Sequence, residues 1–204
     1  MSPRSYRLGK REAGASETRL RILEATRQVL AAEEESDLGM EYIARQADVS
    51  RLTIYYQFKS RPGLLEALYD YLAMRGNMRS MAEVFHEPDP SVAVDKLVRT
   101  FVGFWSSDPV VIRRLRGMAT LDPDIAQGIR ARDARRQHIA REIVWRTVLR
   151  HNKDSTRDQD DLTVDILSML TSFESYDALA RSGHTLDQIT ATILRLCRLA
   201  LGLS

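Results

Sequence analysis

The chain of 204 residues carries 30 Lys and Arg against 28 Asp and Glu, so its formal net charge of +2 excludes a polycationic protein. Its length is sufficient for a substantial core, in one domain or in one small and one larger unit. The single cysteine, Cys197, excludes an internal disulfide, and the lack of a membrane-length apolar run or signal-peptide core predicts a soluble, cytoplasmic protein.

The N-terminal part of the chain is basic. Residues 1–15 have no apolar pattern and contain four cations, Arg4, Arg7, Lys10 and Arg11. We therefore expect a flexible basic arm, which either enters a DNA minor groove or is a disordered tail. From about residue 16 to residue 34 the pattern is helical, with an apolar stripe formed by Ile22, Leu23, Thr26, Val29 and Leu30.

Residues 39–61 have the pattern of two short helices joined by a tight turn. The first has one apolar face, made of Ile43, Ala44 and Ala47. Ser50 is a good N-cap for the second, because its hydroxyl can accept a hydrogen bond from a free N–H. In the second helix Ile54 and Phe58 face the core, and the other surfaces carry Arg51, Leu52, Thr53, Tyr55 and Gln57. Such a helix fits the major groove of duplex DNA.

Helical periodicity continues through the rest of the chain. The predicted helices cover approximately residues 62–80, 91–107, 110–120, 122–151, 161–181 and 185–201, with a polar loop at 152–160. Gly183 is expected to end one helix, and Thr185 to cap the last. The sequence has no strand-like alternation, internal repeat or glycine-rich phosphate loop, so the predicted fold class is all-α.

Five sequence elements follow one another without gaps across the two short helices and their flanks. They are Ile43-Ala44, Ala47-Asp48-Val49-Ser50, Thr53-Ile54-Tyr55-Tyr56-Gln57-Phe58, Lys59-Ser60-Arg61 and Leu64-Leu65. In this order they resemble the signature of the tetracycline-repressor (TetR) family of transcriptional regulators. Asp48 replaces the family's turn glycine, but Asp tolerates a left-handed conformation. Pro62-Gly63 replaces acidic or small residues, and proline suits the first turn of a helix.

The resemblance implies a three-helix, helix-turn-helix DNA-binding domain at residues 16–62 and a helical effector-binding and dimerisation domain at residues 63–204. It assigns base-edge contacts mainly to Arg51, Leu52, Thr53 and Tyr55, and Ser50 is counted among the DNA-binding residues. Phosphate contacts are assigned to Tyr55, Gln57, Lys59 and Arg61. We expect the ring of Tyr56 to pack partly inside the motif, with its hydroxyl free to reach the DNA backbone. The last two helices are expected to form a four-helix homodimer interface.

Aromatic side chains recur in the C-terminal part, and taken one by one they are most simply core residues. Because the family encloses a small-molecule pocket among these helices, we expect Trp105, Phe173 and Tyr176 to bind the ligand. The four histidines and Cys197 lack metal-ligand spacing, and no catalytic signature is present. We therefore predict no metal, no cofactor and no enzymatic activity.

These patterns predict a homodimeric regulator that binds double-stranded operator DNA. A small-molecule effector of unknown identity is expected to release it, so that it acts as a repressor. Two alternatives remain from the sequence. One is an enzyme that uses the helical cavity, and the other is a ligand-sequestering protein with a vestigial helix-turn-helix.

Overall fold

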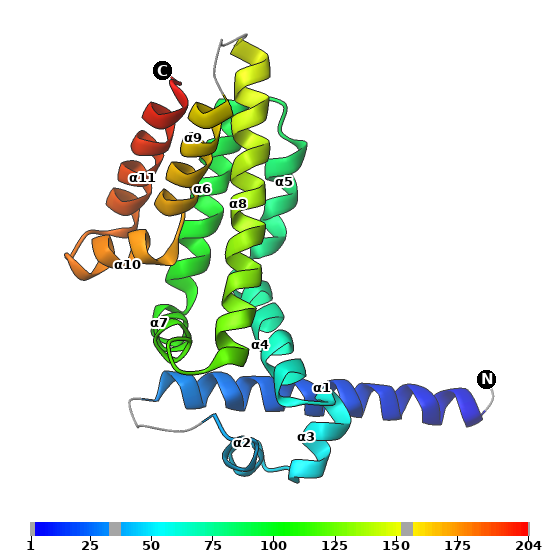
Figure 1. Cartoon of the computed structure of the whole chain (residues 1–204). Coiled ribbons are helices and arrows are strands. Elements are labelled where there is room, and N and C mark those ends of the chain that lie inside the picture. Colours follow the sequence, from blue (N-terminus) through cyan, green and yellow to red (C-terminus); the bar gives the residue numbers. More distant parts are fainter. Residues whose placement is uncertain (1–2, 33–37, 152–156, 204) are drawn as a thin grey trace. The chain divides into compact units, whose positions relative to one another are not determined.

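The computed structural model describes residues 3–32, 38–151 and 157–203 (Figure 1). In these ranges the regular elements are helices and none is a strand, which confirms the all-α prediction. The elements are α1 (Pro3–Ala31), α2 (Met40–Gln46), α3 (Arg51–Phe58), α4 (Arg61–Arg75), η1 (Met78–Ser80), α5 (Met81–His86), α6 (Pro90–Ser107), α7 (Pro109–Met118), α8 (Pro123–His151), α9 (Arg157–Leu170), α10 (Phe173–Arg181) and α11 (Leu186–Leu201). None of these helices is both long enough and apolar enough to cross a membrane.

The chain divides into two compact units. Unit 1 comprises Met1–Tyr71 and Arg113–Gly128, and unit 2 comprises Leu72–Ile112 and Ile129–Ser204. This division differs from the expected domain boundary between residues 62 and 63. Most of α4 and the segment joining α7 to α8 belong with the N-terminal helices, because they contact residues that are distant in the sequence.

Helices α1 to α4 form the core of unit 1. Each contributes buried aliphatic side chains, among them Ile22, Leu30, Ile43, Ile54, Leu64 and Leu68. Helices α2 and α3 have only 7 and 8 residues, too few for stability in isolation, so packing of α2 on α1 and α3 supports them. Helix α4 begins at Arg61, as expected for a helix with proline in its first turn.

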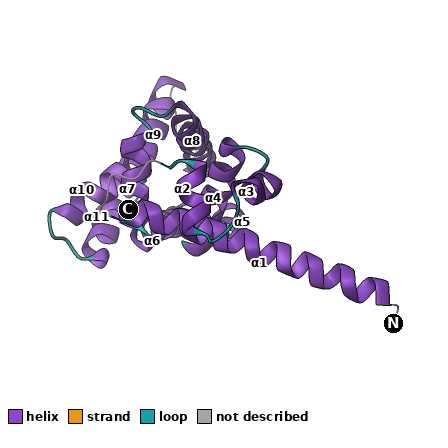
Figure 2. Cartoon of the chain, turned by 90° about the horizontal axis from the view of Figure 1, so that it is seen from below, coloured by secondary structure: helices purple, strands orange, loops and turns teal. Residues whose placement is uncertain are grey.

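Helix α1 begins at Pro3, well before the predicted start near Ser16. Its first turns extend away from the other helices of unit 1 (Figure 2). The prediction of an unstructured arm therefore differs from the structure over residues 3–15, whereas residues 1 and 2 lie outside the described part. The physical reason is that Arg, Lys, Glu and Ala have good helix propensity, and a helix propagates readily from turns that are already packed.

The core of unit 2 is built around α6, which packs against α5 and α11. The inward face of α6 carries Val94, Leu97, Val98, Phe101, Val102 and Trp105, all buried. Helix α11 adds Ile189, Ile193, Cys197 and Leu201. Burial raises the pKa of the Cys197 thiol to about 12, so this side chain stays protonated and acts as a small core hydrophobe.

Two helices end at residues other than those predicted from the sequence. The one expected to reach residue 80 ends at Arg75, because Asn77 adopts a left-handed conformation with a φ of 55° that does not continue the helix. The one expected over 161–181 is divided into α9 and α10, and Ser172 caps α10 by accepting a hydrogen bond from Ser175 N at 3.2 Å. Residues 152–156 of the expected loop lie outside the described part.

The predicted caps that flank α11 are confirmed. Gly183 has a φ of 83° after the end of α10, a left-handed conformation that glycine adopts without steric cost. Thr185 Oγ1 accepts a hydrogen bond from Gln188 N at 3.3 Å, and the Gln188 side chain accepts one from Thr185 N at 2.9 Å. This reciprocal pair is a capping box. Helix α10 runs across the ends of α9 and α11 (Figure 1).

Candidate nucleic-acid interface and effector region

The turn between α2 and α3 has the geometry expected of the motif. Asp48, at the position of the family's glycine, has a φ of 51° and thus adopts the left-handed conformation. Ser50 Oγ accepts a hydrogen bond from Thr53 N at 3.1 Å, which confirms the predicted cap of α3. The same hydroxyl lies 2.8 Å from Thr53 Oγ1. The Ser50 side chain is therefore engaged in starting the helix.

Helix α3 has one buried side and one exposed side. Ile54 and Phe58 are buried, as predicted, whereas Leu52 exposes 77% of its surface. Arg51 is also exposed, and its Nη2 donates a hydrogen bond to Tyr55 Oη at 3.2 Å. The start of α3 thus offers solvent a cation, an aliphatic group and hydroxyls. These groups match the acceptors and the thymine methyl of base edges.

Tyr56 lies differently from expectation. Its side chain is 74% exposed, so the ring is not packed inside the motif. Residues two apart on a helix point in nearly opposite directions, and the neighbours Ile54 and Phe58 already face the core. Lys59 Nζ lies 5.5 Å from the centroid of the Tyr56 ring. The end of α3 therefore presents an exposed phenol and an exposed ammonium side by side.

Arg19 of α1 supports the C-terminal end of α3, a role that the sequence analysis missed. Its Nη1 donates a hydrogen bond to Gln57 O at 2.9 Å, and its guanidinium lies 4.3 Å from the centroid of the Phe58 ring. A cation at the C-terminus of a helix satisfies a free carbonyl and interacts favourably with the helix dipole. The Gln57 side chain, expected to contact phosphate, donates from Nε2 to Ala15 O at 3.3 Å.

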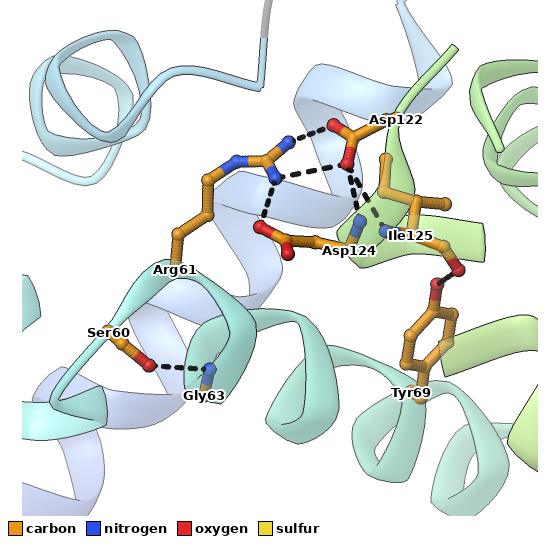
Figure 3. A network of polar contacts seen from close by, with 7 residues as sticks. All are labelled: Ser60, Arg61, Gly63, Tyr69, Asp122, Asp124 and Ile125. Carbon is orange, nitrogen blue, oxygen red and sulfur yellow. Dashed lines mark hydrogen bonds and ion pairs between the residues drawn. The ribbon is translucent and has the colours of Figure 1, made fainter. Parts of the chain in front are cut away.

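Arg61 is held by two carboxylates of unit 1 (Figure 3). Its Nη2 lies 2.5 Å from Asp122 Oδ2, and its Nη1 lies 3.1 Å from Asp124 Oδ2. The hydrogen bond from Arg61 holds the pKa of Asp122 below its usual value, and the reverse contact raises the pKa of Arg61. Both terminal nitrogens are engaged, so this geometry does not support the expected phosphate contact of Arg61.

A local hydrogen bond, also drawn in Figure 3, holds the connection between α3 and α4. Ser60 Oγ accepts a hydrogen bond from Gly63 N at 3.1 Å. A Cβ at Gly63 would lie 2.1 Å from Phe58 O, so a larger residue would have to displace the backbone. Further along α4, Tyr69 Oη donates to Ile125 O at 3.1 Å. Helix α3 is thus closely followed by α4, which is hydrogen-bonded to the start of α8 through Tyr69.

The predicted effector residues come together within unit 2. The ring centroids of Trp105 and Phe173 lie 5.6 Å apart, and those of Phe173 and Tyr176 lie 6.1 Å apart. Trp105 Nε1 donates to Thr171 O at 3.0 Å. All three side chains are buried, exposing 8%, 3% and 6%, so in this conformation they belong to the core and their role in ligand binding stays a prediction. A recess of about 240 Å³ among α8, α9 and α11 is lined by other residues.

Within the described ranges, no group of three or more His, Cys, Asp or Glu side chains is arranged to hold a metal ion.

Comparison with known proteins gives a consistent result. The family described as "Bacterial regulatory proteins, tetR family" matches residues 22–68. The HTH-type transcriptional regulator AlkX of Mycobacterium tuberculosis is 33% identical over 121 residues, which are 57% of this chain and 54% of AlkX. The HTH-type transcriptional regulator SrpR of Pseudomonas putida is 42% identical over 66 residues, covering 32% of this chain and 30% of SrpR. The chain thus matches about half the length of one relative and less than a third of the other.

Similarity of fold extends further along the chain. A crystal structure described as a putative TetR-family transcriptional regulator from Syntrophomonas wolfei has a TM-score of 0.73 and 14% sequence identity, and the match covers 93% of this chain and 97% of that one. At this identity the likeness shows the fold. The family match covers α2, α3 and the capped turn between them, where Asp48 and Ser50 have the expected conformations. Residues 22–68 thus match the TetR family of bacterial regulatory proteins, and the fold of the chain resembles that of TetR-family transcriptional regulators.

Proposed function

We propose that this protein binds operator DNA through α2 and α3 and that a small-molecule effector lowers its affinity for DNA. The observation that carries the proposal is the exposed side of α3, where Arg51 and Leu52 stand beside the buried Ile54 and Phe58. A structural pair of helices has no need of a solvent-exposed leucine beside an exposed arginine. The exposed Leu52 matches the apolar contact that a thymine methyl requires.

The proposed contacts divide into two kinds. Arg51, Leu52, Thr53 and Tyr55 read base edges from the start of α3. At its end, Tyr56 and Lys59 contact phosphate, and this pair takes the role first expected for Arg61. Arg19 and Arg61 act as positioning residues, because their guanidinium groups bind within unit 1. A contact between DNA and the basic residues at positions 4–11 stays a prediction.

A homodimer is proposed because the outer faces of α9 and α11 carry exposed apolar side chains. Leu162 and Met169 are exposed on α9, and Leu196 and Leu199 on α11. Helices α9 and α11 pack side by side in unit 2, so these four side chains are suited to a four-helix interface between two copies. A dimer also satisfies the need for two recognition helices roughly 34–36 Å apart, as in successive major grooves.

The effector is proposed to bind at Trp105, Phe173 and Tyr176. These rings come from α6 and α10, and Trp105 Nε1 donates a hydrogen bond to Thr171 O. A flat apolar ligand would separate the rings and bind a conformation different from the closed one. The ligand releases DNA only to the extent that it binds this conformation more tightly than the DNA-binding one. Helix α4 runs along the chain from unit 1 into unit 2, so it is suited to carry the change.

The DNA-binding proposal is tested with a DNA fragment from the protein's own promoter in an electrophoretic mobility assay. Arg51→Ala is expected to cost about 1–3 kcal/mol on the cognate site and to relax preference at one base pair. Lys59→Ala should weaken binding to all sequences alike and reduce the salt slope by about one unit. If the parent protein fails to shift its own promoter, or both variants bind like the parent, the proposed role of α3 is wrong.

The effector proposal has its own test. In a Trp145→Phe background, Trp105 is the remaining tryptophan, and an aromatic ligand should quench its fluorescence over the concentration range that releases DNA. Linkage requires operator DNA to weaken the ligand by the same factor. Quenching without any change in DNA affinity would separate ligand binding from regulation.

A further inference from the structure

A second recess of unit 2 is lined by residues of α6 other than Trp105. It has a volume of about 310 Å³ and runs between α6 and the segment formed by η1 and α5. Its polar lining consists of Asn77, Ser80, Glu83, Lys96, Arg99 and Thr100. This volume is at the lower end of the range for small-molecule sites, so an occupant would be a metabolite of few atoms.

The two sides of the recess carry opposite charges that are not paired with each other. Arg99 projects from α6 and Glu83 from α5, and both are exposed. Among the described residues neither has a hydrogen-bond or ion-pair partner. The second cation is already neutralised, because Lys96 Nζ lies 2.7 Å from Glu87 Oε2. Within the described part of the chain, Arg99 and Glu83 are therefore a cation and a carboxylate of the recess without a protein partner.

The recess also contains uncharged hydrogen-bonding groups, the hydroxyls of Ser80 and Thr100. Ser80 Oγ lies 3.2 Å from Thr100 Oγ1, and Ser80 Oγ donates to Asn77 O at 2.9 Å. The Thr100 hydroxyl retains acceptor capacity beyond this contact. Gly103, at the α6 side of the recess, leaves open space where a side chain would stand. The recess thus has polar groups along its length and room beside Gly103.

From these features we infer that the recess binds a small zwitterion of the amino-acid class. The ligand's carboxylate accepts charge-assisted hydrogen bonds from the Arg99 guanidinium, and its ammonium donates to the Glu83 carboxylate. The two protein charges lie on different helices and satisfy a molecule that carries both opposite charges. A simple anion leaves Glu83 unpaired beside it, and a simple cation leaves Arg99 unpaired. The inference does not depend on DNA binding.

The test begins with the full chain and the twenty standard amino acids, compared by thermal shift. The amino acid with the largest shift is then titrated by calorimetry beside two analogues, one lacking the ammonium and one lacking the carboxylate. For L-serine these are 3-hydroxypropionate and ethanolamine. We expect each analogue to bind at least about tenfold more weakly than the amino acid, because each loses one charge-assisted contact.

Variants then locate the site. Arg99→Gln and Glu83→Gln should each weaken the amino acid at least about tenfold, whereas Arg195→Gln, at an exposed arginine of α11, should leave its affinity unchanged. Gly103→Leu should abolish binding by filling the recess. Gly117→Leu is its control, because that glycine also has open space at its Cβ position, and circular dichroism confirms that both variants fold.

Four results would overturn the inference. They are the absence of any shift with all amino acids, equal binding of an analogue that lacks one charge, unchanged binding by the Arg99 and Glu83 variants, and unchanged binding by Gly103→Leu. Because the readout is ligand affinity in the absence of DNA, failure here is distinct from failure of the proposed operator binding.

Discussion

Removing the Arg61 guanidinium should destabilise unit 1 by about 2 kcal/mol. The side chains of Arg61 and Asp122 expose 26% and 22% of their surface, and that of Asp124 exposes 42%. A hydrogen bond to a well-buried charged group contributes about 1.5–3 kcal/mol, whereas an exposed ion pair contributes about 0–1 kcal/mol. The half-buried Asp122 contact falls between these limits at about 1.5 kcal/mol, and the more exposed Asp124 contact adds about 0.5 kcal/mol.

A double-mutant cycle with Arg61→Ala and Asp122→Asn measures the first contact. Asp122 Oδ1 also accepts hydrogen bonds from the backbone N–H groups of Asp124 and Ile125, as an N-cap of α8 does. Asparagine caps a helix about as well as aspartate, so Asp122→Asn removes the charge and keeps the cap. Urea unfolding followed by circular dichroism gives the free energy of unfolding for the four proteins. We expect a coupling energy of about 1–2 kcal/mol.

If the two single effects add to within about 0.3 kcal/mol, Arg61 and Asp122 do not interact, which contradicts the expected coupling. The salt dependence of DNA binding supplies a second check. A phosphate contact by Arg61 would make the slope shallower by about one unit in Arg61→Ala. We expect the slope to stay unchanged while the protein becomes less stable.

Three further changes have outcomes that follow from local geometry. Gly63→Ala should destabilise the protein by about 1–3 kcal/mol in urea unfolding, since its Cβ would lie 2.1 Å from Phe58 O. The pKa of Glu24 is lowered from 4.5 to about 2, and the largest cause is the hydrogen bonding from Arg27. The stability that this carboxylate contributes is therefore fully present above its usual pKa and is lost as the pH falls towards 2. Leu199→Glu should convert the proposed dimer to a folded monomer in sedimentation velocity, because Leu199 is exposed in the single chain.

Matched controls separate these effects from general damage. Gly117→Ala meets no atom within 4 Å and should stabilise the protein by about 0.4–1 kcal/mol; equal destabilisation by both glycine variants would contradict the proposed clash. Glu24→Gln should have a flatter stability profile at acid pH than the parent. Ile193→Glu should unfold the chain, because Ile193 is buried in unit 2. A parent protein that sediments as a monomer would remove the dimer proposal.

The sequence by itself determined the features that depend on neighbours a few residues apart. The cap of α3 at Ser50 and the capping box of Thr185 involve partners three residues away, and Gly183 takes its left-handed φ next to the helix it ends. The two buried residues of α3, Ile54 and Phe58, follow from helical spacing. Such features can be read from the sequence because the interacting groups and the period that aligns them lie within one or two turns.

The contacts of the outward residues depended on the tertiary structure. Arg61 matched the pattern of a phosphate-binding cation, yet it binds Asp122, which lies 61 residues away in the sequence. Arg19 had no recognised role, although its contact with Gln57 O spans 38 residues. The Tyr56 ring was expected to pack partly inside the motif, whereas the opposite face of α3 already supplied Ile54 and Phe58. A charged or amphipathic side chain is compatible with several partners, and only folding selects one.

The larger arrangement was decided in the same way. Hydrophobic periodicity indicates which face of a helix is buried but not which helix covers it, so the assignment of Arg113–Gly128 to unit 1 was not visible in the sequence. The division between α9 and α10 likewise depends on Ser172 acting as a cap where the apolar pattern continues. Trp105, Phe173 and Tyr176 were correctly expected to be near one another. That they pack as core in this conformation is a property of tertiary packing, because space between side chains is set by all the helices that enclose them.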